Sequence, residues 1–280
     1  MKQERRGFLR AGTSSLVLVA ATSMGWVKPR LAYAAAWEKE AFENKDLDTV
    51  MSSLGSVSPI TSNDITIRSP ELAENGAVVP VEISSTIPNC GAIAIMIDQN
   101  PFPLAAKFEF HNGAMGYVAT RLRLAKSTDI RAIIRSSGKV FSATKPIKVT
   151  ISGCDPNSSP FLNSAESANS RRVGSFLVGP MKIRASMVGD TAEIKCMMNH
   201  PMDTGFVKIS QTGQIIPAHH ITNVTCTVNG KIVVEAQLGG GISTNPYLGL
   251  KIKGAGKGDA VGIKWVDNQG YSNSVESQIS

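Results

Sequence analysis

The chain has 280 residues, of which 42% are hydrophobic, 18% charged and 6% aromatic. This length and composition predict one or two globular domains, each able to bury a core. The formal net charge of +7 arises mainly at the N-terminus: residues 1–34 hold six of the 29 Lys and Arg and one of the 22 Asp and Glu, which leaves 23 basic against 21 acidic residues beyond them. A nucleic-acid-binding protein needs a clustered basic face, and none is evident, so we expect no nucleic-acid partner.

The first 34 residues predict an export signal. The run RRGFLR at residues 5–10 resembles the twin-arginine (Tat) motif, and AYA at residues 32–34 is a small-x-small cleavage site. The apolar stretch between them is too short and too rich in Ser, Thr and Gly to span a bilayer stably. We expect export by the Tat pathway to the periplasm and no membrane insertion of the mature chain. An ordinary secretory signal is the alternative, and it leads to the same compartment.

Hydrophobic periodicity then predicts one short helix followed by strands. Residues 37–55 place Leu47, Val50, Met51 and Leu54 at helical spacing and end at a glycine. From Ile65 the period changes to two, and turn residues separate most of the apolar runs. Seven strands are predicted here, in the runs DITIRSP, AVVPVEISS, AIAIMIDQ, AAKFEFH, MGYVATRLRLA, DIRAIIRSS and KVFSATKPIKVTIS.

A second strand series follows a stretch without periodicity. Residues 155–178 are rich in Ser, Asn and Pro and are typical of a linker. Asn229-Gly230 between two apolar runs is a strong hairpin signal. The predicted fold is all-β, with two immunoglobulin-like antiparallel β-sandwich domains at residues 35–154 and 179–280 and a short helix after the signal peptide. The strands of the second domain are predicted in MKIRASMV, TAEIKCMMN, HHITNVTCTVN, KIVVEAQL, YLGLKIKG, AVGIKWVDN and YSNSVESQI.

Four cysteines occur without CxxC, haem-attachment or Cys/His metal spacing. Cys90, Cys196 and Cys226 lie in or beside apolar strands and are interpreted as small structural residues, because a buried thiol is unreactive. A disulfide between Cys196 and Cys226 is an open alternative, since their strands could be neighbours.

Cys154 has different surroundings, in the run KVTISGCDPN. Gly153 precedes it, and Asp155 and Pro156 follow. Proline lacks a backbone donor and restricts its predecessor, so the strand cannot continue. We expect Gly153, Asp155 and Pro156 to act as a flanking hinge and the Cys154 thiol to be exposed.

The run GKVFSATKPIKVTISGC, with SPELAENGAVVPVEISSTIPN, resembles SoxY, the sulfur-carrying subunit of the bacterial sulfur-oxidation (Sox) system. Residues from about 180 onward, including NHPMDTG and GISTNPYL, resemble its partner SoxZ. The chain is thus similar to a SoxY–SoxZ fusion. The resemblance implies immunoglobulin-like folds and a carrier that is not an enzyme, with thiosulfate-derived sulfur attached covalently at Cys154. The usual tail is Gly-Gly-Cys-Gly-Gly at a free carboxyl end, whereas here Ser152, Asp155 and Pro156 replace three glycines and another domain follows.

The resemblance also implies partners: a c-type cytochrome complex that loads thiosulfate, a sulfate-releasing hydrolase and a sulfane dehydrogenase, all periplasmic. Two alternatives remain at this point. One is an accessory or binding module for a periplasmic redox dehydrogenase that has lost sulfur transfer. The other is a thiol enzyme with Cys154 as nucleophile, which the missing base disfavours.

No cofactor is predicted. His200 and the pair His219-His220 lack a carboxylate at ligand spacing, so we interpret them as structural or docking residues and predict no metal. Arg121, Arg123 and Arg135 alternate along strands and are expected on solvated sheet faces. Asn100 lies in a predicted turn.

Overall fold

The computed structural model describes residues 36–153, 180–207 and 212–280. Residues 36–280 form one compact unit. Below, the N-terminal half means residues 36–153 and the C-terminal half residues 180–280. The predicted signal peptide and the predicted linker both lie outside the described residues. Among the residues that are described, no helix is long and apolar enough to cross a membrane.

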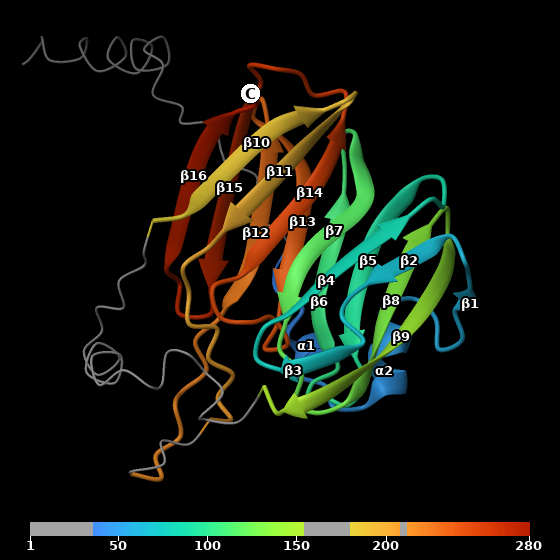
Figure 1. The fold of residues 1–280 in the computed structure, drawn as a ribbon, viewed down its shortest axis with the longest axis vertical. Helices are drawn as coiled ribbons and strands as arrows, with labels where there is room; N and C mark the ends of the chain where they lie inside the picture. The colour runs from blue at the N-terminus through green and yellow to red at the C-terminus, as the bar shows by residue number, and fades with distance from the viewer. Residues whose placement is uncertain (1–35, 154–179, 208–211) are drawn as a thin grey trace, which may run out of the picture. The chain divides into compact units, whose positions relative to one another are not determined.

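All fourteen predicted strands are present, and two short strands add to them (Figure 1). The N-terminal half contains β1 (Ile60–Thr61), β2 (Ile65–Arg68), β3 (Leu72–Asn75), β4 (Val79–Ser85), β5 (Cys90–Ile97), β6 (Leu104–Phe110), β7 (Ala114–Leu122), β8 (Thr128–Ser136) and β9 (Lys139–Ile151). The C-terminal half contains β10 (Lys182–Val188), β11 (Thr191–Met197), β12 (Ile221–Val228), β13 (Lys231–Leu238), β14 (Tyr247–Lys253), β15 (Ala260–Asp267) and β16 (Ser272–Gln278). The all-β sandwich prediction is confirmed.

The Asn229-Gly230 hairpin is also confirmed. It joins β12 to β13, with Val228 opposite Lys231. The backbone φ angles of Asn229 and Gly230 are 49° and 75°. Two successive positive φ angles match the twist of the flanking strands, which is why Asn-Gly is favoured at this turn.

The strands form two sheets, and both sheets pass through both halves of the chain. The larger has the order β1-β9-β8-β5-β6-β13-β12-β15-β16, with β3 also paired to β9, and the smaller has the order β10-β11-β14-β7-β4-β2. The halves meet where β6 pairs with β13 and β7 pairs with β14, both antiparallel. The sequence predicts two sandwich domains and does not indicate that their sheets join. At the junction the strands satisfy each other's backbone groups, which would otherwise be open sheet edges.

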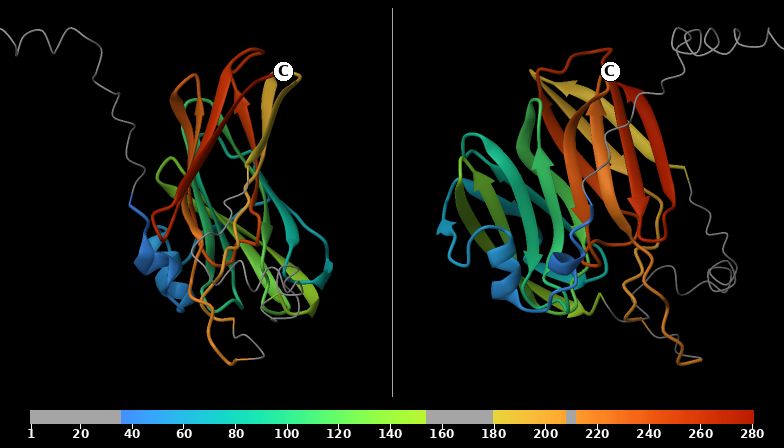
Figure 2. Two further views of the ribbon diagram at one scale, coloured as in Figure 1. Left: turned by 90° about the vertical axis from the view of Figure 1, so that its left-hand side faces the viewer. Right: turned by 180° about the vertical axis from the view of Figure 1, so that it is seen from behind.

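The hydrophobic core is also continuous between the two halves. Buried apolar side chains from both halves belong to a single cluster, which includes Phe108 and Val118 on one side of the junction and Val234 and Leu250 on the other. Figure 2 shows the two sheets stacked face to face. The two halves therefore share one hydrophobic interior, and we expect them to unfold together.

The predicted helix at residues 37–55 is two short helices, α1 (Lys39–Phe42) and α2 (Leu47–Ser53). The break is local, because the Asn44 side chain accepts from the Asp46 N–H and the Asp46 side chain caps α2 by accepting from the Thr49 N–H. Both helices lie on the outer face of the larger sheet (Figure 2), where Phe42, Val50 and Met51 among others form a second buried cluster.

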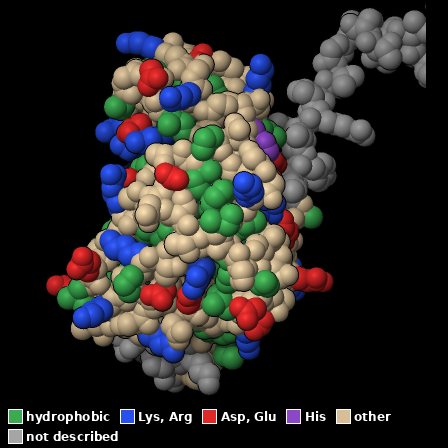
Figure 3. All heavy atoms as spheres, turned by 90° about the vertical axis from the view of Figure 1, so that its right-hand side faces the viewer, with side chains coloured by type: hydrophobic (Ala, Val, Ile, Leu, Met, Phe, Trp, Pro, Cys, Tyr) green, Lys and Arg blue, Asp and Glu red, His purple; other side chains and the backbone are tan. Residues whose placement is uncertain are grey.

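On the face shown in Figure 3, positive and negative side chains are interspersed and apolar side chains lie between them. This face lacks the single-sign field that a polyanion would require.

Candidate functional site

The last described residue before Cys154 is Gly153, which follows the end of β9 at Ile151 by two residues. Cys154, Asp155 and Pro156 lie outside the described residues, so the exposure of the thiol and the three-residue hinge stay predictions. Gly153 itself is buried, and the backbone around it is held by hydrogen bonds that involve two other segments.

These hydrogen bonds form what we call the Gly153 anchor, which consists of Gly76, Leu124, Ile151 and Gly153. The Gly153 N–H donates to the Leu124 carbonyl at 2.8 Å, the Leu124 N–H donates to the Gly76 carbonyl at 2.7 Å, and the Gly76 N–H donates to the Ile151 carbonyl at 2.8 Å. Three chain segments are thereby tied together immediately before the cysteine.

Close backbone contact explains the two glycines of the anchor. A Cβ atom on Gly153 would lie 2.3 Å from the Gly76 carbonyl oxygen and 2.7 Å from that of Leu124. A Cβ atom on Gly76 would lie 2.4 Å from the Leu124 carbonyl oxygen. These distances are far inside van der Waals contact, and the neighbouring atoms are backbone atoms that cannot rotate away. Gly153 is therefore needed for close packing.

Ser152, which replaces a glycine of the usual tail, strengthens the anchor. Its hydroxyl donates to the Ala125 carbonyl at 2.6 Å, on the loop that also accepts from Gly153. A hydrogen-bonded serine holds the backbone more firmly than glycine would. The approach to Cys154 is thus fixed on its N-terminal side.

The other three thiols are in unreactive surroundings. Cys196 on β11 and Cys226 on β12 are buried, and Cys90 at the start of β5 is half-buried. All three are free, so the structure contains no Cys196–Cys226 disulfide. Burial raises the pKa of Cys90 to about 11 and the pKa values of Cys196 and Cys226 to about 12. Because thiolate is the reactive form, these cysteines are poor nucleophiles at neutral pH.

The structure brings a carboxylate to two of the histidines. The Asp267 Oδ2 atom lies 2.8 Å from the His219 Nε2 atom and 3.4 Å from the His200 Nε2 atom. Asp267 is almost 70 residues away in sequence from His200, so ligand spacing along the chain gave no signal for it. The three side chains have the composition of a metal site, and the ligand atoms lie close enough to one another to hold an ion.

Hydrogen bonding argues against a metal there. The Met202 N–H donates to the Nδ1 atom of His200 at 3.1 Å, so this nitrogen is an acceptor. In a neutral imidazole the proton then lies on Nε2, which donates to Asp267 and has no lone pair for a metal. The Asp267 Oδ1 atom accepts from the backbone N–H groups of Gln269 and Tyr271. The cluster of His200, His219 and Asp267 is therefore a structural hydrogen-bond network, which joins the connection between β11 and β12 to the end of β15.

This network should make stability depend on pH. Burial and the neighbouring His219 lower the pKa of His200 to about 4, and they also lower the pKa of His220. Histidine in the unfolded chain has a pKa of about 6.5, so below that pH the unfolded state takes up protons that the native state does not. Stability is therefore complete above pH 6.5 and is lost as the pH falls toward 4. We expect the free energy of unfolding to drop by roughly 2 kcal/mol between pH 7.5 and 5.

Urea unfolding at several pH values tests this expectation. A His200→Gln variant should show a shallower pH dependence over the same window, whatever its stability at pH 7.5. A free energy of unfolding that stays constant between pH 7.5 and 5 in the unmodified protein would contradict the argument.

One arginine expected on a solvated sheet face is buried instead. Arg123 has 8% of its surface exposed. Its guanidinium donates to the Met202 carbonyl at 2.9 Å and to the Thr244 hydroxyl at 3.0 Å, both in the C-terminal half. Arg121 is half-buried beside Tyr247, whereas Arg135 is exposed as predicted. Alternation along a strand could not distinguish a solvated face from one covered by the other half.

Comparison with known proteins agrees with the earlier resemblance. The family described as "Sulfur oxidation protein SoxY" matches residues 51–154, a range that ends at the cysteine after the Gly153 anchor. The family described as "Sulphur oxidation protein SoxZ" matches residues 181–278. No curated protein matches the chain.

Among solved structures, the sulfur carrier protein SoxY from Chlorobium limicola f thiosulfatophilum is 36% identical, covering 37% of this chain and 94% of that one with a TM-score of 0.34. A biofilm-associated protein BSP domain is 8% identical, covering 85% of this chain and 34% of that one with a TM-score of 0.26. A β-glycosidase from Bacteroides vulgatus is 9% identical, covering 78% of this chain and 25% of that one with a TM-score of 0.23. The last two likenesses are too distant to bear on function.

Proposed function

The chain belongs to the SoxY and SoxZ families, which it joins in one polypeptide with a carrier role in sulfur oxidation, and on this premise we propose that it holds its cargo covalently on Cys154. The cargo is a thiosulfate-derived sulfur group, and Sox-type partner enzymes carry out the chemistry on it. The single observation that supports this most is the Gly153 anchor, which ends one residue before the end of the SoxY match and holds the chain immediately before Cys154.

The geometry supports separate roles for two parts of this segment. The Gly153 anchor holds the chain in place, and Cys154 carries the cargo. The hydrogen bonds at Gly153 and Ser152 fix the chain before Cys154. A cargo tethered at a fixed root is delivered at a high effective concentration to an enzyme docked beside that root. The usual tail has glycines on both sides of its cysteine, whereas the residues immediately before Cys154 are held here by backbone and side-chain hydrogen bonds.

The loading step balances as an oxidation. The Cys154 thiol loses its proton, its sulfur forms a bond with the sulfane sulfur of thiosulfate, and two electrons pass to the c-type cytochrome partner. The hydrolase then adds water across the terminal sulfur–sulfur bond, which releases sulfate and a proton and leaves a persulfide on Cys154. The carrier supplies the sulfur atom and its position, and the partners supply the oxidant and the hydrolytic site.

We further propose that this occurs in the periplasm, after Tat-dependent export. The support is the RRGFLR run at residues 5–10 and the AYA site at residues 32–34.

Intact-mass spectrometry of the mature protein after incubation with thiosulfate and the cytochrome loading complex tests the proposal. We expect an added thiosulfate-derived mass on the unmodified protein and on Cys90→Ser, which removes the other thiol that is not fully buried. Cys154→Ser should gain no mass, because the acceptor sulfur is absent.

A growth experiment separates the carrier from the accessory module. If a strain with Cys154→Ser oxidises thiosulfate as well as the unmodified strain does, the cysteine carries no essential cargo. That result would reject the carrier proposal and leave the accessory module.

A further inference from the structure

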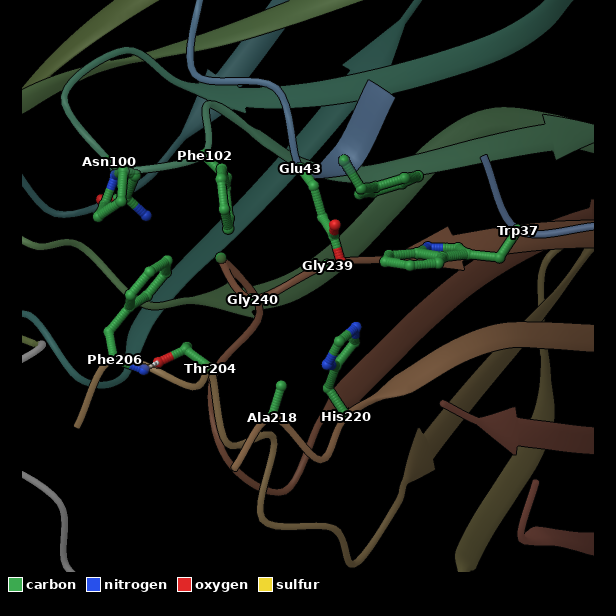
Figure 4. A pocket seen from close by; sticks show the side chains of 13 residues that line it. Trp37, Glu43, Asn100, Phe102, Thr204, Phe206, Ala218, His220, Gly239 and Gly240 are labelled. Atoms are coloured by element: carbon green, nitrogen blue, oxygen red, sulfur yellow. Dashed lines mark hydrogen bonds between the residues drawn. The ribbon is translucent and has the colours of Figure 1, made fainter. Parts of the chain in front are cut away.

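A pocket lies where segments of the two halves meet (Figure 4). Its walls come from the segment around α1, the connection between β5 and β6, the Gly239–Gly241 turn, and Thr204, Phe206, Ala218 and His220. Its volume is about 570 Å³ including the open mouth. A cavity that holds benzene has roughly 150 Å³. The cavity volume here is about 60 Å³, so one edge of a small aromatic ring enters and the rest of the ring lies in the open mouth.

Two aromatic pairs line this pocket, and Phe102 and Phe206 lie across it from Trp37 (Figure 4). Phe102 and Phe206 have ring centroids 5.3 Å apart, and Trp37 and Phe42 have ring centroids 5.5 Å apart. Phe206 is exposed although it is a large apolar residue. Ring faces and edges presented in this way favour a planar ring between them.

His220 supplies a polar group that has no partner in the folded chain. The residue is 92% buried by its relative accessibility of 8%, and neither ring nitrogen has a hydrogen-bond partner among the described residues. Its ring lies in the pocket beside Trp37, with centroids 5.4 Å apart. Buried polar atoms are almost always hydrogen-bonded, and an unpaired one at the wall of a pocket indicates a polar atom on the missing occupant.

The charges around the pocket exclude an anionic occupant. Burial and His219 lower the pKa of His220, so its imidazole is neutral at neutral pH and offers one donor and one acceptor. The Glu43 carboxylate lies at the pocket wall (Figure 4). A thiosulfate, sulfate or sulfonate group would meet this negative charge without a balancing cation from the wall.

We propose that this pocket binds an uncharged planar aromatic ring that carries one hydroxyl or N–H group, such as a phenol or an indole, with that group hydrogen-bonded to His220. The aromatic pairs contact the ring, and His220 gains the partner it lacks. This is a second, non-covalent site that takes a different chemical class from the cargo on Cys154.

A short series of hydrogen bonds links the pocket to the Gly153 anchor. Asn100 at the pocket wall donates to the Arg123 carbonyl at 2.8 Å and accepts from the Ala125 N–H at 2.9 Å. The loop that contains these two residues also holds Gly153 and Ser152. Asn100 therefore connects the pocket wall to the loop that accepts the hydrogen bonds of the anchor.

Titration of the mature protein with p-cresol, followed by NMR of the histidine rings and by calorimetry, tests the proposal. We expect saturable binding with a selective shift of the His220 ring resonances, and no such shift with thiosulfate. Absence of saturable binding, or binding that leaves His220 unchanged, would overturn it.

Two variants separate the hydrogen bond from the apolar contacts. His220→Phe should weaken p-cresol binding by roughly fivefold, as expected for one lost hydrogen bond, and should leave toluene binding unchanged. Phe206→Ala should weaken the binding of both probes, whereas Val188→Ala, at an exposed valine on β10, should affect neither. Equal affinity of the unmodified protein and His220→Phe for p-cresol would overturn the role of His220.

A phenol group could belong to a free small molecule or to the tyrosine side chain of a docked protein. A blocked Gly-Gly-Tyr-Gly-Gly peptide distinguishes these sources. Binding of the peptide at least as tightly as p-cresol indicates a tyrosine side chain of a partner. Binding of p-cresol without the peptide indicates a free aromatic molecule.

Discussion

Replacing Gly153 by alanine is expected to lower the free energy of unfolding by about 2–3 kcal/mol. The added Cβ would lie 2.3 Å from the Gly76 carbonyl oxygen, and that oxygen accepts a hydrogen bond from Leu124. Relief of the clash requires the backbone to shift, which weakens the anchor. For a protein of this size the unfolding midpoint should fall by about 5–10 °C.

Differential scanning calorimetry measures this effect, and Gly256→Ala is a matched control. A Cβ at Gly256 would meet no atom within 4 Å, and the backbone there is not in the left-handed region. The control should change the free energy of unfolding by no more than about 0.5 kcal/mol. A Gly153→Ala protein as stable as the control would show that the anchor is not packed as described.

Arg123→Ala is expected to destabilise the protein by about 3 kcal/mol, because the guanidinium makes two charge-assisted hydrogen bonds across the junction. Its loss removes the donors to the Met202 carbonyl and the Thr244 hydroxyl. Arg123→Lys should recover only part of the stability, since a single ammonium lacks the fork that reaches both acceptors. The unfolding midpoint of the alanine variant should fall by roughly 6–12 °C.

Thermal unfolding of Arg123→Ala and Arg135→Ala provides the comparison. Arg135 is exposed and pairs with Glu109 at 3.3 Å on the surface, so its removal should cost no more than about 0.5 kcal/mol. If the two alanine variants lose the same stability, Arg123 does not hold the halves together.

The strands were predictable because their side chains alternate between core and solvent. β12, for example, has buried and half-buried residues in alternation from Val224 onward, and the Asn229-Gly230 turn follows it directly. The single helix predicted at residues 37–55 was wrong in one respect: Asn44 and Asp46 form side-chain hydrogen bonds that divide it. Local periodicity does not reveal such competition.

The continuity of the two sheets was not predictable from pattern. Which strands lie at an edge, and which edge meets which, depends on the assembled fold, and neither β6 nor β13 differs in sequence pattern from an ordinary buried strand. The same reason explains the burial of Arg123. Asp267 is distant in sequence from both His200 and His219, and only the fold brings it to them.

Cys154 could be chosen as the candidate functional thiol from its neighbours in the sequence alone. Glycine before Cys154 and Asp-Pro after it distinguish this thiol from the three that lie within or beside strands. The reason for Gly153 is different from the one expected, since the structure uses it for close packing against Gly76 and Leu124.

Alkylation of the native protein with iodoacetamide at neutral pH, followed by peptide mass mapping, tests the central claim most directly. We predict rapid modification of Cys154 alone, with Cys90, Cys196 and Cys226 modified only after denaturation, and protection of Cys154 once the protein is loaded from thiosulfate. A Cys154 that resists alkylation in the unloaded native protein, or loading that protects a different cysteine, would contradict the account.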